Sequence, residues 1–321
     1  MRMWALAMAV AIIGFNAMVA LGWAQAGKSV YAAARVVWLS NLLGGVLFGF
    51  GMVLASGCGS KTLVRLGAGS LKGLVVLGVL GVSAFATLKG ITAAARVATV
   101  DAVAFTLPGG QDLPTLIAPL LGGSTPRAAL AAGLLVGGAL LAWVLSRPEG
   151  RSGEVLFAGI GLGAVVAAAW WVSGVLGHLA EHPLTLDETY LATNSGRMEA
   201  LSFVAPVGYT LDWLLLFSDK AKLLTLGIVN VFGVVVGAAI VALATRTFRF
   251  EGFAGTEDTA KHVVGAALMG VGGVTAMGCT IGQGLSGVST LALGSFIALA
   301  GIIGGAVLGL RYQIWRVERT A

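Results

Sequence analysis

Two cysteines, Cys58 and Cys279, are the residues with the clearest capacity for chemistry in this sequence. They are the only cysteines among 321 residues, and each ends a similar run, GFGMVLASGC at 49–58 and GVGGVTAMGC at 270–279. Four positions match at one constant offset: Gly49 with Gly270, Gly51 with Gly272, Gly57 with Gly278 and Cys58 with Cys279. Chance rarely aligns four positions that include both cysteines of a chain, so the match indicates an internal repeat with equivalent thiols.

A thiol in an apolar, glycine-rich segment is suited to bind a soft anion weakly. A neutral S–H group is a weak hydrogen-bond donor, and its sulfur is polarizable. Because a neutral thiol does not repel an anion, it can hold a terminal sulfur weakly and release it, which suits transport better than tight binding. An isolated cysteine in a membrane helix is usually a small packing residue, but two at equivalent positions of a repeat favour a functional role.

The residues around the cysteines predict two breaks in helical structure, at 57–62 (GCGSKT) and at 278–287 (GCTIGQGLSG). Free backbone amides and helix N-termini at such breaks attract anions. Gly57, Gly59 and Gly278 are therefore candidate sources of amide donors. A further match is weaker: Gly-Ser followed by an apolar residue occurs at 69–71 and again at 294–296.

Two other polar residues lie close to the cysteines, and each has two interpretations. Lys61 either attracts the anion at the mouth of a path or extends to the membrane surface and sets topology. Gln283 either donates an amide N–H to the substrate or bridges two helices. The three histidines form no metal-ligand spacing with the cysteines, so we expect no metal site and no cofactor. A disulfide between the cysteines is not expected, because the predicted topology places them on separate hairpins.

The composition requires a lipid environment. Hydrophobic residues make up 57% of the chain and charged residues only 11%, against about 25% charged in soluble domains. The 49 glycines lie largely inside apolar runs, where small residues let transmembrane helices pack closely. The net charge of +6 does not indicate nucleic-acid binding, because the basic residues are scattered between apolar runs and fit topology determinants instead.

Length and lack of charge predict eight spanning helices. They cover roughly residues 3–23, 37–56, 71–91, 126–146, 155–177, 221–244, 263–282 and 288–310. The first is long enough to span and is expected to be a retained helix rather than a signal sequence. Two longer connections separate some spans, and we expect short interfacial or re-entrant helices in both, for example around 198–205 and 211–217. The longer connections are 92–125 and 178–220.

Lysine and arginine positions favour a topology with both termini in the cytoplasm. In that topology the first cysteine run enters the membrane from outside and the second from inside, which makes an inverted repeat. We therefore predict an all-α, polytopic membrane protein with two inverted pseudo-symmetric halves. Short re-entrant helices would meet at a central Gly-Cys site. The chain would form a single transport domain of residues 1–321, with repeats at about 1–146 and 155–321.

The segments around the cysteines resemble one known family. GFGMVLASGCGSKTLVRLG and MGVGGVTAMGCTIGQGLSGVSTLALGSF are similar to the YeeE/YedE family of bacterial inner-membrane proteins, and the resemblance covers most of the chain. The second block is the more specific, with Gly278-Cys279-Thr280-Ile281 and Gly284-Leu285-Ser286-Gly287 in the pattern of the family.

This resemblance implies a thiosulfate uptake channel or carrier in the bacterial inner membrane. It implies halves related by a pseudo-two-fold axis, and a path along which cysteine thiols pass the anion through S–H contacts to its sulfur. Thr280 joins the candidate path residues on this basis. The best-understood members have three such cysteines and this chain has two, so one station is missing or replaced. Other members are linked to selenium handling and to sulfur oxidation, which widens the substrate class to small sulfur or selenium species.

Three hypotheses about function follow. The first is a permease for thiosulfate or a related species such as sulfite, sulfide or sulfane sulfur, which is not an enzyme and delivers its cargo to a soluble cytoplasmic sulfur carrier or sulfurtransferase. The second is a membrane sulfurtransferase that forms a cysteine persulfide, which needs an accessible, activated thiol. The third is a structural subunit that anchors a sulfur-oxidising partner. Loss of both cysteines would abolish the first two activities and spare the third.

Overall fold

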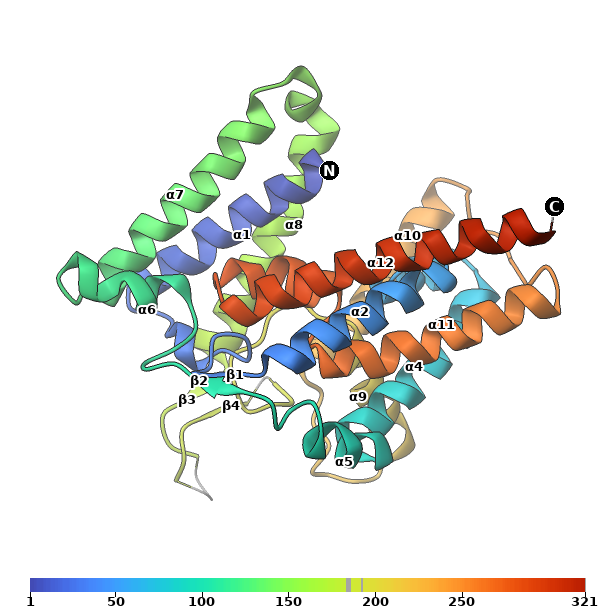
Figure 1. Cartoon of the computed structure of the whole chain (residues 1–321), viewed down its shortest axis with the longest axis horizontal. Coiled ribbons are helices and arrows are strands. Elements are labelled where there is room, and N and C mark those ends of the chain that lie inside the picture. The colour runs from blue at the N-terminus through green and yellow to red at the C-terminus, as the bar shows by residue number, and fades with distance from the viewer. Residues whose placement is uncertain (183–185, 192, 321) are drawn as a thin grey trace. The chain divides into compact units, whose positions relative to one another are not determined.

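The computed structural model describes residues 1–182, 186–191 and 193–320, and its regular structure is almost entirely helical (Figure 1). Residues 183–185 and 192 of the predicted connection 178–220 lie outside the described residues. The strands in the described part are short antiparallel pairs: β1 (Arg35–Val36) with β2 (Phe105–Thr106), and β3 (His178–Leu179) with β4 (Thr189–Tyr190). The expected all-α class is therefore confirmed.

Seven stretches in the described residues are long and apolar enough to cross a membrane. They are Arg2–Ala20, Trp38–Gly67, Leu71–Lys89, Thr125–Leu145, Gly153–Leu176, Leu226–Ala244 and Leu293–Arg319. Seven of the eight predicted spans correspond to these stretches. The protein is therefore a multi-pass membrane protein.

The chain folds into two compact units. Unit 1 comprises Met1–Val36, Phe105–Leu201 and Gly282–Phe296, and unit 2 comprises Val37–Ala104, Ser202–Ile281 and Ile297–Ala321. Each unit is therefore assembled from segments that are far apart in the sequence.

Unit 1 is built on three long helices that lie side by side (Figure 1). They are α1 (Arg2–Ala20), α7 (Thr125–Leu145) and α8 (Gly153–Trp171). Glycines allow their close approach: a Cβ added at Gly163 of α8 would lie 2.6 Å from Val10, and one at Gly137 of α7 would lie 2.6 Å from Ile13. In membranes, close packing through small residues replaces much of the hydrophobic driving force.

Shorter elements complete unit 1. They are η1 (Ala26–Lys28), α6 (Leu113–Ile117), η2 (Ala118–Leu121), η3 (Pro148–Arg151), the π-helices η4 (Val172–Leu176) and η5 (Gly282–Gly287), and the start of α12 (Leu293–Thr320). Residues 281–292 are all buried. The segment that follows Cys279 therefore forms part of the core of unit 1.

Unit 2 is organised around α2 (Trp38–Leu54), which packs between α11 (Thr256–Thr275) and α12 (Figure 1). Its glycines contact α11 on one face and α12 on another. Gly51 and Gly265 face each other so closely that a Cβ on either would lie 2.6 Å from the carbonyl oxygen of the other. A Cβ at Gly45 would lie 2.6 Å from Ala298 O of α12.

The remaining helices of unit 2 pack against α11 or against one another. They are α3 (Gly59–Gly67), α4 (Leu71–Lys89), α5 (Ile91–Ala98), α9 (Val204–Leu215) and α10 (Leu226–Ala244). The prediction of a helix around 198–205 is wrong. Met198 instead forms a parallel β-bridge with Ser29, and α9 begins only at Val204.

The eighth predicted span, at 263–282, differs from the structure. Helix α11 covers Thr256–Thr275 and is not among the seven apolar stretches. Its first turns carry Glu257, Asp258 and Lys261, which lower its hydropathy. It also ends four residues before Cys279, because a turn rather than a helix carries that cysteine.

The contact between α2 and α11 gives a direct test of the packing. In Gly265→Ala the new methyl group would lie 2.6 Å from Gly51 O and 2.7 Å from Ala55 N, which are backbone atoms, so the helices must separate. Overpacking of this kind costs roughly 1–3 kcal/mol. We expect a lower midpoint of thermal unfolding in detergent. In the matched control Gly237→Ala nothing lies within 4 Å of the new Cβ, so the midpoint should not fall; equal midpoints for both variants would contradict this packing.

Candidate functional site

The two cysteines follow helix ends that have the same backbone conformation. At the end of α2, Gly57 N–H donates to Met52 O at 2.9 Å and Ser56 N–H donates to Val53 O. At the end of α11 the equivalent bonds join Gly278 to Gly273 at 2.8 Å and Met277 to Val274. This pair of bonds defines a Schellman motif, whose left-handed residue is Ser56 in one copy and Met277 in the other, each with φ of 58°. The sequence repeat is thus also a repeat of local structure.

Cys58 lies at the N-terminal end of a new helix. It is the N-cap of α3, and its carbonyl accepts hydrogen bonds from Thr62 N–H at 3.0 Å and from Thr62 Oγ1 at 2.9 Å. Its Sγ lies 3.2 Å from Ser60 Oγ. The thiol is partly buried. It therefore sits where the helix dipole and free amides favour a negative charge.

Cys279 is fully buried and is followed directly by helical residues. Its neighbour Thr280 has a buried hydroxyl oxygen for which no hydrogen-bond partner exists among the described residues. A buried hydroxyl without a partner costs free energy, so this group is available for a ligand. Neither cysteine forms a disulfide bond.

The helical breaks are shorter than the sequence predicts. Of the predicted break 57–62, only residues 57 and 58 are non-helical, because α3 begins at Gly59. Of 278–287, residues 280 and 281 are helical and 282–287 form the π-helix η5. The breaks therefore reduce to the turn that precedes each cysteine.

The π-helix also changes how the two copies align. Ser70 lies 12 residues after Cys58 and Ala292 lies 13 residues after Cys279, and each is the bridge residue before the next helix. A π-bulge is a one-residue insertion in an α-helix, which accounts for the difference. The predicted match of 69–71 with 294–296 is therefore wrong, and the structural equivalent of the first segment is 291–293.

The helix ends that carry the two turns point in opposite directions within unit 2. A Cβ on Gly265 would lie 3.0 Å from Leu54 Cβ, at the end of α2, whereas Gly44 near the start of α2 abuts Ala276, at the end of α11. The two helices are therefore antiparallel. Since an α-helix rises 1.5 Å per residue, the two helix ends are separated by roughly 15 Å along the pair.

Apolar side chains connect the two cysteine-bearing segments. A Cβ on Gly59 would lie 3.7 Å from Leu80 Cδ1 of α4 and 4.0 Å from Phe203 Cβ. The next residue, Val204, packs against Gly273 in the last turn of α11. All three apolar side chains are buried. Sequence reasoning missed these residues, because nothing separates them from other apolar residues of a membrane helix.

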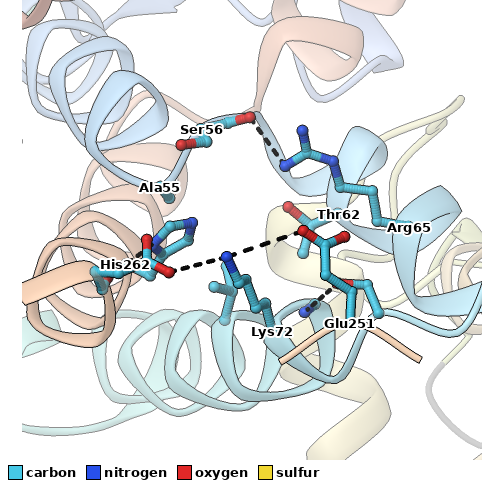
Figure 2. Close-up of a pocket in the computed structure, with 11 residues that line it drawn as sticks. Ala55, Ser56, Thr62, Arg65, Lys72, Glu251 and His262 are labelled. Carbon is cyan, nitrogen blue, oxygen red and sulfur yellow. Dashed lines mark hydrogen bonds and ion pairs between the residues drawn. The ribbon is translucent and has the colours of Figure 1, made fainter. Parts of the chain in front are cut away.

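A polar cavity lies beside the turn that carries Cys58 (Figure 2). Its volume is about 230 Å³. The lining residues come from the turn after α2, from α3, from α4 and its N-cap, from the segment before α11 and from α11 itself: Ala55, Ser56, Thr62, Arg65, Ser70, Lys72, Gly73, Val76, Glu251, Asp258 and His262. From the sequence, basic residues such as Arg65 and Lys72 fit topology determinants, and only the structure brings these two together with Asp258 and His262.

The remaining predicted site residues divide between the units. Gly57, Gly59, Gly278 and Thr280 accompany the two cysteines in unit 2. The amides predicted as anion donors at Gly57 and Gly278 are not free, because both donate within the Schellman motifs. Lys61 is exposed on α3, and its side chain covers Gly57, where a Cβ would lie 2.9 Å from Lys61 Cδ. Gln283 lies buried in η5 of unit 1, close to Gly287. Unit 2 thus contains all the predicted site residues except Gln283.

Comparison with known proteins identifies the family. The profile of the family described as "Sulphur transport" matches residues 1–308. The chain belongs to this sulphur transport family. The expected relationship to the YeeE/YedE proteins is thereby confirmed.

Two bacterial members of the sulphur transport family show how far the similarity extends. The thiosulfate transporter TsuA of Escherichia coli (strain K12) is 29% identical over 300 residues, which cover 91% of this chain and 78% of that protein. The thiosulfate transporter TsuA of Spirochaeta thermophila (strain ATCC 700085 / DSM 6578 / Z-1203) is 28% identical over 275 residues, which cover 81% of this chain and 73% of that protein.

The unequal burial of the two cysteines predicts unequal reactivity. In the folded protein a maleimide should modify Cys58, which is partly exposed, far faster than Cys279, which has no exposed surface. In denaturing detergent both should react. Mass spectrometry of proteolytic peptides measures each site, and unfolded protein is the internal control. Rapid labelling of Cys279 in the folded protein would contradict the structure of this turn.

Proposed function

We propose that this member of the sulphur transport family carries thiosulfate across the bacterial inner membrane as an intact anion. Cys58 and Cys279 are the two thiols that contact it in turn. The observation that carries the proposal is the pair of matching cysteine turns at opposite ends of the antiparallel helices α2 and α11. Both bacterial relatives are named thiosulfate transporters, which supports thiosulfate as the cargo.

The chemistry at each station fits a soft, doubly charged anion. At Cys58 the amides at the start of α3 attract negative charge, and the thiol provides a weak donor to the terminal sulfur. At Cys279 the Thr280 hydroxyl provides a second donor that has no protein partner in the described residues. Neutral donors hold the anion without the strong Coulomb attraction that a buried cation would exert. Weak contacts of this kind permit both binding and release.

The antiparallel direction of α2 and α11 supports an inverted-repeat mechanism. The segments after the two turns would then enter the membrane from opposite faces, with one thiol nearer each side. The basic residues favour both termini in the cytoplasm, which places the Cys58 turn on the cytoplasmic side and makes Cys279 the earlier station on the way in. A soluble sulfur carrier or sulfurtransferase would then consume the anion inside the cell.

Uptake by cells tests the proposal. A bacterium without its own thiosulfate importers would express wild type, Cys58→Ala or Cys279→Ala at matched membrane levels, and growth on thiosulfate and uptake of radiolabelled thiosulfate would be measured. Loss of one hydrogen-bonded contact of about 1.4 kcal/mol corresponds to tenfold, so each alanine variant should lose about tenfold or more of the uptake rate. Wild-type uptake in both variants would show that the cysteines only pack.

The Thr280 hydroxyl allows a matched comparison in the same assay. Thr280→Val removes a hydroxyl with no partner among the described residues, whereas Thr275→Val removes one that already donates to Val271 O at 2.8 Å. We expect reduced uptake only in Thr280→Val. Equal effects of the two substitutions would indicate general damage to the chain around the Cys279 turn and would remove Thr280 from the path.

A further inference from the structure

The cavity beside Cys58 contains charges that the two-thiol path does not use. Arg65 and Lys72 are its basic residues, and Glu251 and Asp258 are its acidic residues, with His262 beside them (Figure 2). Its volume of about 230 Å³ is large enough for a small anion with several water molecules. The formal charges cancel, so the cavity attracts an anion only where its cations are unpaired or can be released from their carboxylates.

Lys72 is paired with both carboxylates. Its Nζ lies 2.9 Å from Asp258 Oδ2 and 3.9 Å from Glu251 Oε1. Figure 2 shows the ammonium group between Glu251 and the side where His262 lies. Asp258 also accepts from Ala254 N–H at 3.0 Å, and this hydrogen bond together with that from Lys72 lowers the pKa of the Asp258 carboxyl. Asp258 therefore stays ionised and holds Lys72 in place.

Arg65 is in a different situation. Its Nη1 donates to Ser56 O at 3.1 Å, and among the residues that the structure describes no carboxylate forms an ion pair with it. A guanidinium group carries five N–H donors and matches the oxygens of an oxoanion in a two-pronged arrangement. Arg65 thus presents an uncompensated charge and spare donors at the wall of the cavity.

Two of the residues that line the cavity also belong to the Cys58 turn or are hydrogen-bonded to it. Ser56 is the left-handed residue of the turn before Cys58, and Thr62 donates its hydroxyl to Cys58 O. The carbonyl of Ser56 in turn accepts from Arg65. The Arg65 guanidinium group is therefore hydrogen-bonded to the backbone of the turn that carries Cys58.

We propose that this cavity is a second, oxoanion-binding site next to Cys58, with Arg65 as its main ligand and Lys72 as a second ligand that leaves Asp258 when the anion enters. The thiol contacts the terminal sulfur at its own station, and the cavity, which Cys58 does not line, holds the charged oxygens in a separate step. The identity of the anion as thiosulfate rests on the proposed function. The cavity itself would also bind sulfate. Exchange of Lys72 between the carboxylate and the anion keeps binding weak enough for release.

Binding to the purified full-length protein tests this site. Isothermal titration calorimetry in detergent would measure the affinity for thiosulfate and, separately, for sulfate. Arg65→Gln should weaken binding of either anion by about tenfold or more. Asp258→Asn should strengthen it by about threefold or more, because Lys72 loses its nearer carboxylate. A salt bridge with only a structural role would give no such gain.

Matched controls separate charge in the cavity from charge elsewhere. Arg151→Gln removes an arginine that, like Arg65, donates to a backbone carbonyl, Leu145 O, but does not line the cavity. Glu257→Gln removes the carboxylate next to Asp258, which pairs with Lys261 and Arg316 instead. Both controls should bind as wild type does. Thermal unfolding would confirm that each variant is folded.

The outcomes are decisive. Weaker binding in Arg65→Gln with tighter binding in Asp258→Asn supports the site. Unchanged binding in a folded Arg65→Gln, or no binding of either anion to wild type, overturns it. If Arg65→Gln does not fold, Glu251→Gln provides a second carboxylate variant, and the absence of any gain in both carboxylate variants overturns the proposal. Failure of the proposed function would appear separately, as the absence of thiosulfate uptake by wild-type cells.

Discussion

A helix that ends away from water must satisfy its last carbonyl groups within the protein, and both cysteines depend on the way this is done. The Schellman bonds at the ends of α2 and α11 close each helix and turn the chain sharply. The residue in the left-handed conformation is not glycine in either copy, but Ser56 and Met277. An L-residue in that conformation costs roughly 1–2 kcal/mol. Backbone geometry therefore presents each thiol at the start of a new helix.

The glycine contacts between α2 and α11 extend this constraint to the whole of unit 2. Because Gly51 and Gly265 bring the two backbones together, the helices cannot slide without a clash. Their antiparallel direction places the two turns at opposite ends of the pair. If the membrane lies across the helix pair, as the predicted topology requires, this one helix contact places one cysteine turn toward each side of the membrane.

Neutral and charged groups have separate tasks in this account. The thiols and the Thr280 hydroxyl contact the anion, because in a low-dielectric interior a bare cation in their place would bind a divalent anion too tightly to release it. Arg65, which forms no ion pair with the described residues, lies instead in a polar cavity beside the proposed path. There Asp258 moderates the charge of Lys72 through an ion pair of 2.9 Å.

The equivalence of the two cysteine turns could be predicted from the sequence, because glycines and cysteines at a constant offset mark equivalent positions directly. The matching conformation of the two turns confirmed the repeat at the level of local structure. The π-helix η5 could not be predicted. Its extra residue shifts the second copy by one position relative to the first, and the glycine-rich sequence does not show where such a residue is inserted.

The cavity could not be predicted for a different reason. Arg65 and Lys72 belong to one part of the chain and Asp258 and His262 to another, and no local pattern connects them. Basic residues near the end of an apolar run usually set topology. The i, i+4 spacing of Asp258 and His262 on α11 was the one available signal, and it marks a shared helix face without identifying what faces it.

The most direct test of the central claim follows the two sulfur atoms of thiosulfate separately. Purified protein in liposomes would receive thiosulfate labelled with different sulfur isotopes at the terminal and central positions, and mass spectrometry would analyse the contents of the vesicles. The account predicts intact, doubly labelled thiosulfate inside, with no label left on either cysteine. Terminal label retained as a persulfide on Cys58 or Cys279, with sulfite released, would contradict it and indicate sulfur transfer instead of transport.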